Sequence, residues 1–552
     1  MADRQRVAVV TGGGGGIGAA IAEELGRTGA FVVTVDPLVS VDGSEQLPIP
    51  EETTAGRIVA AGGAARASSV SVTDAEGVRV LFESLVEEFG GLDAVVNVAG
   101  ITRPTSFAKG SEADWLGVLS VHLDGYLNVL RAALPSMAAA GHGHILGVTS
   151  GSGWRAANAG AYGCAKRAVA ALTWQLGRQA PPGVVVNAMS PIAATRMVTA
   201  ALSRARPAGA AGSSGSATGG LSLASMPTPD ELGPLGAHLV ADVFSSCRGR
   251  VIFAGGSEIA VIDEPRFLEV VRAEGATSMA HVLEAVTAGA LAPAEAKQAT
   301  NGGSNARFAT IFGELEPTEP PVSEVRSCAV FTDQPELGAA IGAALEARGV
   351  RSAVVETDSI DSGFQAAATA VAAAVEQIGR LEAVVVAIVG GTRATGTADG
   401  WQGVLAEHDG IVRDIHGEAS WARAVSDYAT AADRPVRLVT LTDATTTGGR
   451  SRAQAAAQLA RSARGATDDC VSAFSVSVEA PGALAVSTVT ELTAHLVCGP
   501  DTPVLSGAEL AVGDGWFGLR SHPRLVGSIT FGGPAIPAWF DDTLRSMLGE
   551  AD

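Results

Sequence analysis

The chain has 552 residues, of which 47% are hydrophobic and 17% charged, and its formal net charge at pH 7 is −20. This length is too great for one hydrophobic core, so we expect two or more domains, and the composition excludes a disordered chain. The negative charge argues against nucleic acids and anionic membranes as partners, because both bind basic surfaces.

The cysteines and the first residues bear on the cellular compartment. The five cysteines are odd in number and lack metal-ligand spacing, so we expect reduced, buried thiols and no metal site. No charged leader precedes the first predicted strand, and no apolar run approaches the ~20 residues that a membrane helix needs. We therefore expect a soluble, cytoplasmic protein with no membrane partner.

Strands and helices alternate through the first half. Strands are expected at 6–11, 31–36, 92–100, 144–150, 184–191 and 250–261, and helical patterns at 75–89, 112–139, 162–179 and 264–290. This order predicts right-handed βαβ units in a doubly wound parallel sheet. Residues 37–54 form a predicted enlarged loop, and the Ala-, Gly-, Ser- and Pro-rich segment 203–230 is predicted to be a mobile loop.

A similar order recurs after residues 291–322, which end in EPTEPP and are predicted to be a linker. Strands are expected at 328–332, 352–357, 381–391, 436–442, 470–478 and within 504–516. GAELAV near the end of the second copy is matched with GSEIAV near the end of the first. The sequence thus predicts an α/β protein with two tandem Rossmann-like domains, 1–290 and 323–552.

A glycine cluster, TGGGGGIG over residues 11–18, lies between the first predicted strand and the first predicted helix. Glycine permits positive φ and lets a pyrophosphate approach the N–H groups of a helix N-terminus; a flexible surface turn is the alternative. Asp36 ends the second strand, where a carboxylate can accept hydrogen bonds from an adenosine ribose and repel a 2′-phosphate. Residues 32–56 contain no Arg or Lys, so NAD is favoured over NADP.

Tyr162 and Lys166 begin a predicted helix, and their i,i+4 spacing places them on one face. A phenol with a reference pKa of ~10 is a poor proton-transfer group at neutral pH, and a neighbouring ammonium would lower that pKa. The other two tyrosines have no Lys four residues later. We therefore interpret this pair as catalytic; an exposed helical pair without function is the alternative.

Ser150 and Ser152 follow the preceding strand, where parallel sheets present ligand-binding groups. A hydroxyl there could donate to a substrate carbonyl oxygen and stabilise its developing charge. A serine that only caps the next turn is the alternative, and Thr149 competes for either role.

Five motifs in order over residues 6–262 resemble those of the short-chain dehydrogenase/reductase family. TGGGGGIG resembles TGxxxGxG, Asn97-Val98-Ala99-Gly100 resembles NNAG, Ser150 with Gly153 resembles SxxG, Tyr162 with Lys166 resembles YxxxK, and Ser190-Pro191 through Thr195 resembles PGxxxT. The resemblance implies that the cofactor contacts Gly12, Gly16, Ile17, Gly18, Asp36, Asn97, Ala99, Gly100, Tyr162, Lys166, Pro191 and Thr195.

The resemblance also implies a mechanism. Tyr162 would exchange a proton with the substrate oxygen, Ser150 would hold that oxygen, and Lys166 would bind the nicotinamide ribose and lower the pKa of the tyrosine. His122 stands where the family usually has Asn, and in this it resembles dehydrogenase domains of the peroxisomal multifunctional enzyme type 2, which oxidise 3-hydroxyacyl-CoA. His122 is then expected to order the proton-relay water; a helix-packing histidine is the alternative.

Two further departures affect the motifs of the first half. The spacing from Ser150 to Tyr162 is one residue shorter than usual, which leaves Ser150 against Ser152 open, with Ser150 favoured because it fits SxxG. Ile192 replaces the Gly of PGxxxT, which removes no catalytic group.

The second half departs further from the family. Its glycine-loop position, 332–338, has one glycine, a proline and two acids, and residues 448–463 contain neither Tyr nor Lys. We expect this copy to keep the fold without the site and to take the place of a partner subunit within the chain, with a further homodimer left open. Recognition of a second ligand or protein is the alternative.

The sequence therefore predicts an NAD-dependent oxidoreductase that interconverts a secondary alcohol and a ketone. The substrate is expected to be a 3-hydroxyacyl-CoA or another small lipophilic alcohol, such as a hydroxysteroid or a polyketide. A protein that senses NAD without turnover is the alternative from a different class.

Overall fold

The computed structural model describes residues 4–198, 226–272, 279–301, 307–308, 323–357, 363–388, 400–480, 483–533 and 535–548. Most of the predicted mobile loop 203–230, up to residue 225, lies outside these ranges, as does most of the predicted linker 291–322. Among the helices within these ranges, none is both long and apolar enough to cross a membrane.

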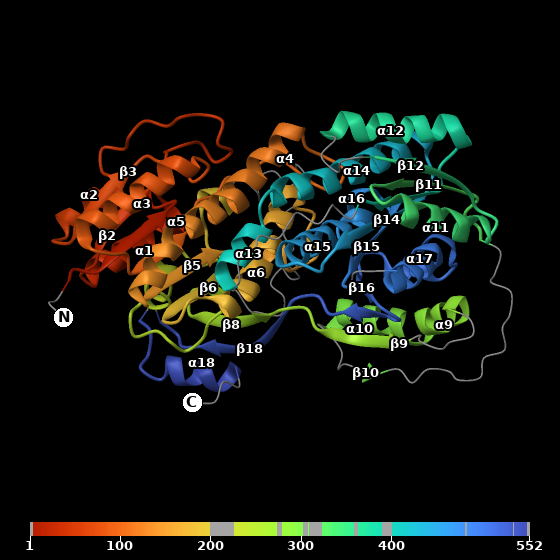
Figure 1. Cartoon of the computed structure of the whole chain (residues 1–552). Helices are drawn as coiled ribbons and strands as arrows, with labels where there is room; N and C mark the ends of the chain where they lie inside the picture. The colour runs from red at the N-terminus through yellow and green to blue at the C-terminus, as the bar shows by residue number, and fades with distance from the viewer. Residues whose placement is uncertain are drawn as a thin grey trace.

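The first half builds a nine-stranded sheet (Figure 1). Its strands, in spatial order, are β18 (Arg524–Thr530), β8 (Glu258–Asp263), β7 (Val251–Gly255), β6 (Val184–Pro191), β5 (Gly143–Val148), β4 (Ala94–Asn97), β1 (Val7–Thr11), β2 (Phe31–Val35) and β3 (Ala64–Ser68). The seven strands from β3 to β7 are parallel, and β8 and β18 are antiparallel to their neighbours. The strand order reverses between β1 and β4, and we call the carboxyl ends of these two strands the crevice, because doubly wound sheets bind their ligands at this point.

The helices of this half cover both faces of the sheet. They are α1 (Gly16–Arg27), α2 (Thr54–Ala60), α3 (Ala75–Phe89), α4 (Glu112–Leu119), a π-helix (Ser120–Asp124), α5 (Gly125–Ala140), α6 (Gly160–Gln179) and α8 (Gly233–His238). Strands such as β1 read as continuous β-branched runs because both of their faces are buried. β3 was not predicted, since its sequence AARAS is small, polar and partly exposed at the sheet edge.

The second half repeats this plan, as predicted. Its sheet runs β10 (Arg307–Phe308), β9 (Phe267–Arg272), β17 (Trp516–Arg520), β16 (Glu509–Gly513), β15 (Val471–Val478), β14 (Val436–Asp443), β13 (Ala383–Ala387), β11 (Ser327–Thr332) and β12 (Arg351–Glu356). Its helices include α9 (Met279–Val286), α10 (Ala292–Asn301), α11 (Pro335–Glu346), α12 (Gly363–Ile378), α13 (Gly400–Glu407), α14 (Ile411–Ala432), α15 (Thr447–Ala460), α16 (Ala463–Ala466) and α17 (Ala483–Cys498), whereas the last helix of the chain, α18 (Phe540–Leu548), packs on the first half. The chain is thus an α/β protein with two Rossmann-like sheets.

Two expectations for the strands are wrong. The segment 250–261 is a hairpin of β7 and β8, because Gly256 turns the chain with φ +62°. GAELAV does not correspond to GSEIAV: β16 is parallel to β15 and begins a hairpin with β17, so its counterpart is β7, whereas GSEIAV lies at the turn and in β8.

Each of the two sheets contains one strand that the other half of the sequence contributes. β9 follows β8 in sequence but pairs with β17 of the second sheet, and β18 follows β17 but pairs with β8 of the first. In Figure 1, β18 and α18 accordingly lie beneath the first half, and β9 beneath the second. The helical pattern expected at 264–290 is wrong for its first part. Residues Phe267–Arg272 form β9 there, which pairs with β17. The domain limits 1–290 and 323–552 stay a prediction, but the sheets themselves do not separate there.

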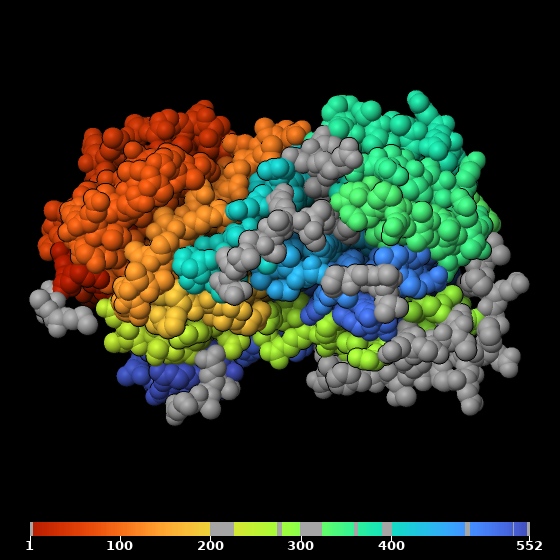
Figure 2. All heavy atoms as spheres, viewed as in Figure 1, coloured from red at the N-terminus to blue at the C-terminus, as the bar shows by residue number. Residues whose placement is uncertain are grey.

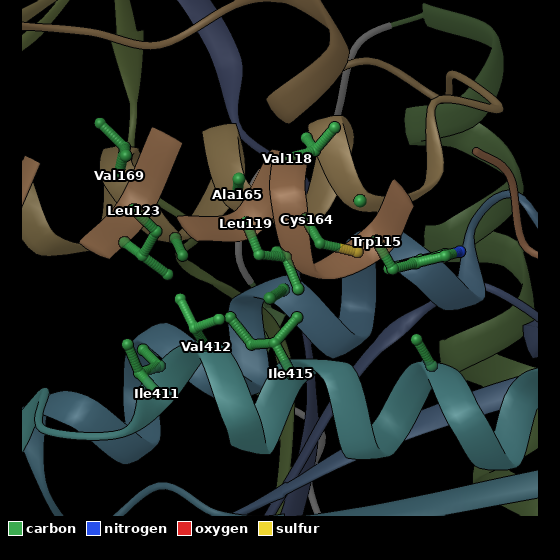
Figure 3. Close-up of a cluster of buried hydrophobic side chains, with 14 of the residues drawn as sticks. Trp115, Val118, Leu119, Leu123, Cys164, Ala165, Val169, Ile411, Val412 and Ile415 are labelled. Atoms are coloured by element: carbon green, nitrogen blue, oxygen red, sulfur yellow. The ribbon is translucent and has the colours of Figure 1, made fainter. Parts of the chain in front are cut away.

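The halves also share a buried apolar core. Figure 3 shows Ile411, Val412 and Ile415 of α14 facing α4, the π-helix and α6. Beside them α6 packs along α15, and Figure 2 shows the two halves as one continuous body. The two halves therefore share one buried interface, and the role of the second half as a substitute for a partner subunit stays a prediction.

A buried ion pair joins α6 to the second sheet. Arg167 Nη2 lies 2.5 Å from Glu509 Oε1, and the two side chains are 0% and 3% exposed. Gln454 of α15 accepts from Arg167 Nε at 2.8 Å and donates to Glu509 Oε2 at 3.2 Å. Burial alone would raise the pKa of Glu509, but the charges of Arg167, His522 and Arg461 outweigh it and lower the pKa to about 2.

We expect Glu509→Gln to lower the free energy of unfolding by about 3–5 kcal/mol, because it leaves the Arg167 charge buried without its partner. Glu76→Gln, which breaks an exposed i,i+3 pair with Arg79, serves as the control and should leave stability unchanged. Denaturant unfolding of both variants measures the difference. Equal stabilities would show that the buried pair contributes nothing.

We expect removal of residues 323–552 to leave the first half insoluble or unstable, because the fragment loses β18 and exposes α6 and β9. A milder deletion of residues 524–552 removes β18 and α18, whose Phe540 and Leu544 are buried in the first half's core. That deletion should lower the melting temperature while leaving the α6–α15 contact in place. Solubility and thermal denaturation measure both effects, and a soluble, stable 1–322 fragment would contradict the account.

Candidate active site

The glycine cluster forms the turn from β1 into α1, and two of its glycines are required by packing. Gly12 has φ +66°, and a Cβ there would lie 2.8 Å from the backbone nitrogen of Ala99. A Cβ on Gly18 would lie 2.2 Å from the carbonyl oxygen of Gly12. These two positions bring β1, α1 and the end of β4 together more closely than any side chain allows.

Other glycines of the cluster leave an open surface. A Cβ on Gly16, which has φ +54°, would meet nothing nearer than Thr195 Cγ2 at 3.7 Å. Gly15 caps α1 without any side-chain hydrogen bond to the first turn. The backbone N–H groups at the start of a 12-residue helix are therefore available to an anion, and Ile17 lies in this first turn.

Asp36 follows β2 and lies against the glycine turn. The Gly14 N–H donates to Oδ2 at 3.0 Å, and the Leu38 N–H donates to Oδ1 at 2.8 Å. A Cβ on Gly14 would lie 2.7 Å from Oδ2. Asp36 is thus held at the crevice by backbone donors.

The end of β4 completes this side of the crevice. Thr11 Oγ1 donates to Asn97 Oδ1 at 2.8 Å and accepts from the Ala99 N–H at 3.3 Å. Gly100 lies against the imidazole of His122, because a Cβ there would be 2.3 Å from Cε1. The NNAG-like segment therefore connects the glycine turn to His122.

Ser150 lies beside Tyr162. Its Oγ accepts from the Ser152 N–H at 3.3 Å, and its hydroxyl acts to lower the pKa of the neighbouring Tyr162 phenol. Thr149 is used elsewhere, since its Oγ1 donates to the Lys166 carbonyl at 2.6 Å. A Cβ on Gly153 would lie 2.7 Å from the Lys166 carbonyl carbon, so this glycine lets the serine loop pack directly on α6.

The electrostatics of the Tyr162–Lys166 pair differ from the expectation. Burial raises the pKa of the Tyr162 phenol, and the hydrogen bond from Ser150 offsets only part of that rise. Burial also lowers the pKa of Lys166 to about 7, so its charge is incomplete at neutral pH. Its Nζ donates to the Val148 carbonyl at 2.6 Å and lies 5.8 Å from the centre of the Tyr162 ring. The expected lowering of the tyrosine pKa by the lysine is therefore not seen.

His122 lies in the π-helix between α4 and α5, and its ring meets that of Tyr162 edge-on at 5.0 Å between centres. Nε2 is 3.2 Å from the Ile101 nitrogen and 2.7 Å from the Ile101 oxygen, and Nδ1 has no partner in the described part of the chain. Burial, and secondly the charge of Lys166, lower its pKa well below the usual value. A neutral imidazole with a free ring nitrogen thus lies beside the phenol.

The segment after β6 reaches the glycine turn from the other side. Pro191 ends β6, and Thr195 accepts from the Val198 N–H at 3.2 Å while its methyl group faces Gly16. Arg196 Nη2 would lie 3.5 Å from a Cβ on Gly15. Sequence reasoning missed this cation, although it directly follows the PGxxxT-like segment.

The corresponding region of the second sheet contains an ion pair. Arg452 of α15 lies 2.6 Å from Glu418 of α14, and Thr442 donates to the same carboxylate at 3.2 Å. Arg452 also donates to the Ile388 carbonyl, just beyond β13, at 2.9 Å. By strand order β13 corresponds to β4, so this ion pair lies beside the strand end that corresponds to Asn97 in the first sheet.

At the amino end of β5, away from the crevice, three side chains group together. His142, His144 and Asp242 bring their nitrogen and oxygen atoms within 4.8 Å of one another. Asp242 already accepts from Arg6 Nε at 2.8 Å, and His144 Nε2 contacts the Phe244 carbonyl at 2.9 Å. The carboxylate charge of Asp242 is thus balanced by Arg6.

Comparison with known proteins places the chain among dehydrogenases and reductases. Residues 6–206 match the family model described as short chain dehydrogenase. The chain is 38% identical over 197 residues to the short-chain reductase protein NovJ of Streptomyces niveus, covering 35% of this chain and 72% of that protein. It is 35% identical over 199 residues to peroxisomal multifunctional enzyme A of Dictyostelium discoideum, covering 35% of this chain and 44% of that one.

The whole fold is also similar to a solved structure. The N-domain of a bacterial malonyl-CoA reductase, crystallised with NADP, aligns with a TM-score of 0.63 and 16% identity over 89% of this chain and 95% of that one. At this identity the likeness concerns the fold, including its two halves.

These findings define an α/β oxidoreductase that uses a nicotinamide nucleotide, NAD(P). The chain belongs to the short-chain dehydrogenase/reductase family.

Proposed function

We propose that the first half catalyses NAD(H)-dependent interconversion of a secondary alcohol and a ketone, with Tyr162, Ser150 and Lys166 as the reacting constellation and His122 as its proton-relay partner. The observation that supports this best is the placement of Tyr162 between Lys166, 5.8 Å from its ring centre, and the His122 ring at 5.0 Å, beside Ser150 and next to an open glycine turn. A protein that only sensed the nucleotide would not need a proton-transfer group there.

The residues at the crevice fit a dinucleotide. Gly12, Gly16, Ile17 and Gly18 would present α1 to the pyrophosphate, and Asp36 would accept from the adenosine ribose. Further contacts would come from Asn97, Ala99, Gly100, Lys166, Pro191 and Thr195. When bound, the nicotinamide supplies the hydride chemistry.

The protein's own groups would manage the substrate oxygen and its proton. In the reductive direction Tyr162 donates its proton to the carbonyl oxygen, and Ser150 donates a hydrogen bond that stabilises the developing negative charge. Lys166 would hold the nicotinamide ribose and, when charged, favour the phenolate. His122, with Nδ1 free, would pass the proton onward through water.

We propose an acyl-CoA thioester, a 3-hydroxyacyl-CoA with its 3-ketoacyl-CoA, as the substrate class. Support comes from His122, which stands where the multifunctional-enzyme dehydrogenase domains have a histidine, and from the identity to the Dictyostelium enzyme. A hydroxysteroid or a polyketide ketone is the alternative that a negative result would favour.

We expect the protein to oxidise NADH when a short 3-ketoacyl-CoA is added, and Tyr162→Phe to lower kcat by about 10²–10⁴-fold because the proton donor is lost. Absorbance at the NADH band measures both. Tyr126→Phe, which changes a buried tyrosine on α5, is the matched control. Full activity of Tyr162→Phe would contradict the proposed chemistry, whereas NADH binding without turnover would redirect the search to steroids and polyketides.

We expect the wild type to prefer NADH over NADPH, because Asp36 would repel the 2′-phosphate. Asp36→Ala should lower that preference by about tenfold or more, corresponding to ~1.4 kcal/mol. Asp42→Ala is the control. The Asp42 carboxylate lies in the following loop and accepts hydrogen bonds from Ser40 and Ser44, so its removal should leave the preference unchanged. Cofactor Kd values from fluorescence titration measure it, and an unchanged ratio in Asp36→Ala would contradict the assignment.

A further inference from the structure

The loop that carries Ser150 is held by donors from outside the first half. It runs from Ser150 through the short 3₁₀ turn Gly151–Gly153 to Arg155, and two of its members are glycines. Within the loop, the Gly153 N–H donates to the Ser150 carbonyl at 2.9 Å and the Arg155 N–H to the Gly151 carbonyl at 2.9 Å. Three other carbonyls point to the second half.

Two side chains at the end of α15 and just beyond it bind these carbonyls. Gln458 Nε2 donates to the Ser152 oxygen at 2.9 Å and to the Arg155 oxygen at 2.8 Å. Arg461 Nη1 donates to the Trp154 oxygen at 2.9 Å. Carbonyls 152, 154 and 155 are thus all bound by residues about 300 positions away in sequence.

The donors are themselves fixed. Gln458 is 2% exposed, and its Cγ would lie 3.6 Å from a Cβ on Gly163, within the Tyr162–Lys166 motif. Burial, and secondly the nearby Arg167 charge, lower the pKa of Arg461 to about 10, which keeps it charged at neutral pH. The Arg167–Glu509 pair ties α6 to β16 nearby, because Arg167 also bonds to Gln454, four residues before Gln458 on α15.

We propose that Gln458 and Arg461 are positioning residues for Ser150, so that the second half completes the active site of the first. This inference rests on the proposed role of Ser150. A loop with two glycines has many conformations, and fixing three of its carbonyls from a rigid helix selects the one in which the Ser150 hydroxyl meets Tyr162. The second half thereby contributes to catalysis without touching the substrate or the cofactor.

The test compares variants of the full chain that lose different bonds at one interface. Gln458→Met keeps the size of the side chain and removes both donors. Arg450→Ala is the matched control, because Arg450 lies on α15 and donates to Gln175 of α6 at 3.0 Å, far from the serine loop. We expect Gln458→Met to lower kcat about tenfold or more with the Kd for NADH unchanged, and Arg450→Ala to leave kcat unchanged. Arg461→Lys, which keeps a donor, should retain more activity than Arg461→Met.

A double-mutant cycle separates positioning from a general loss of structure. If Gln458 acts through Ser150, Gln458→Met has almost no further effect on kcat in a Ser150→Ala background. An equal loss in both backgrounds would overturn the proposal. If Ser150→Ala itself leaves activity intact, the proposed function of Ser150 fails; if it lowers activity while Gln458→Met does not, only the positioning role fails.

Two readouts complete the test. Amide hydrogen exchange needs no substrate: residues 152–155 should exchange faster in Gln458→Met than in the wild type or in Arg450→Ala, and unchanged exchange would overturn the proposal.

In alcohol oxidation, which needs the phenolate, loosening the Ser150 hydrogen bond raises the pKa of Tyr162. The rising limb of the pH profile should therefore move to higher pH in Gln458→Met and stay in place in Arg450→Ala.

Discussion

Helix α6 carries Tyr162 and Lys166, and it is buried by packing against α15 of the second half. From Gly160 to Gly177 every residue of this helix except Tyr162 is buried. One side packs on the first sheet and another on α15, and the buried Arg167–Glu509 pair fixes the two halves against each other. Tyr162 and Lys166 are therefore presented at the crevice by a helix whose orientation the second half helps to determine.

The covalent order of the chain makes this arrangement permanent. A pair of separate subunits could dissociate, but here each sheet includes a strand that the other half of the sequence contributes, β18 in the first and β9 in the second. Separation of the halves would strip β18 from β8 and β9 from β17 as well as open the α6–α15 contact. The second half carries a buried Glu418–Arg452 pair close to the end of its strand β13. A copy that keeps a fold can serve as a scaffold without a site of its own.

The sequence was sufficient for the parts of the molecule that rest on local pattern. The glycine turn, Asp36, and the Tyr162–Lys166 helix could be predicted because φ preferences, strand ends and i,i+4 spacing are properties of short segments. The strand exchange could not be predicted, because the pattern of a strand such as β9 does not say which strand it pairs with, and β17 lies about 250 residues away in sequence. Burial likewise reversed the expected direction of the Tyr162 pKa, since desolvation depends on the assembled fold. Gln458 belongs to no sequence motif, and its contact with the loop after Ser150 is visible only in the folded chain.

We propose that, of the two similar halves, only the first holds a cofactor site. Titration of the full-length protein with NADH, followed by calorimetry, tests it most directly. We expect one NADH per chain, and none for Gly16→Val, whose side chain would enter the open face of the glycine turn. Two NADH molecules per chain, or one that still binds to the Gly16→Val variant, would contradict the assignment of the site to the first half alone.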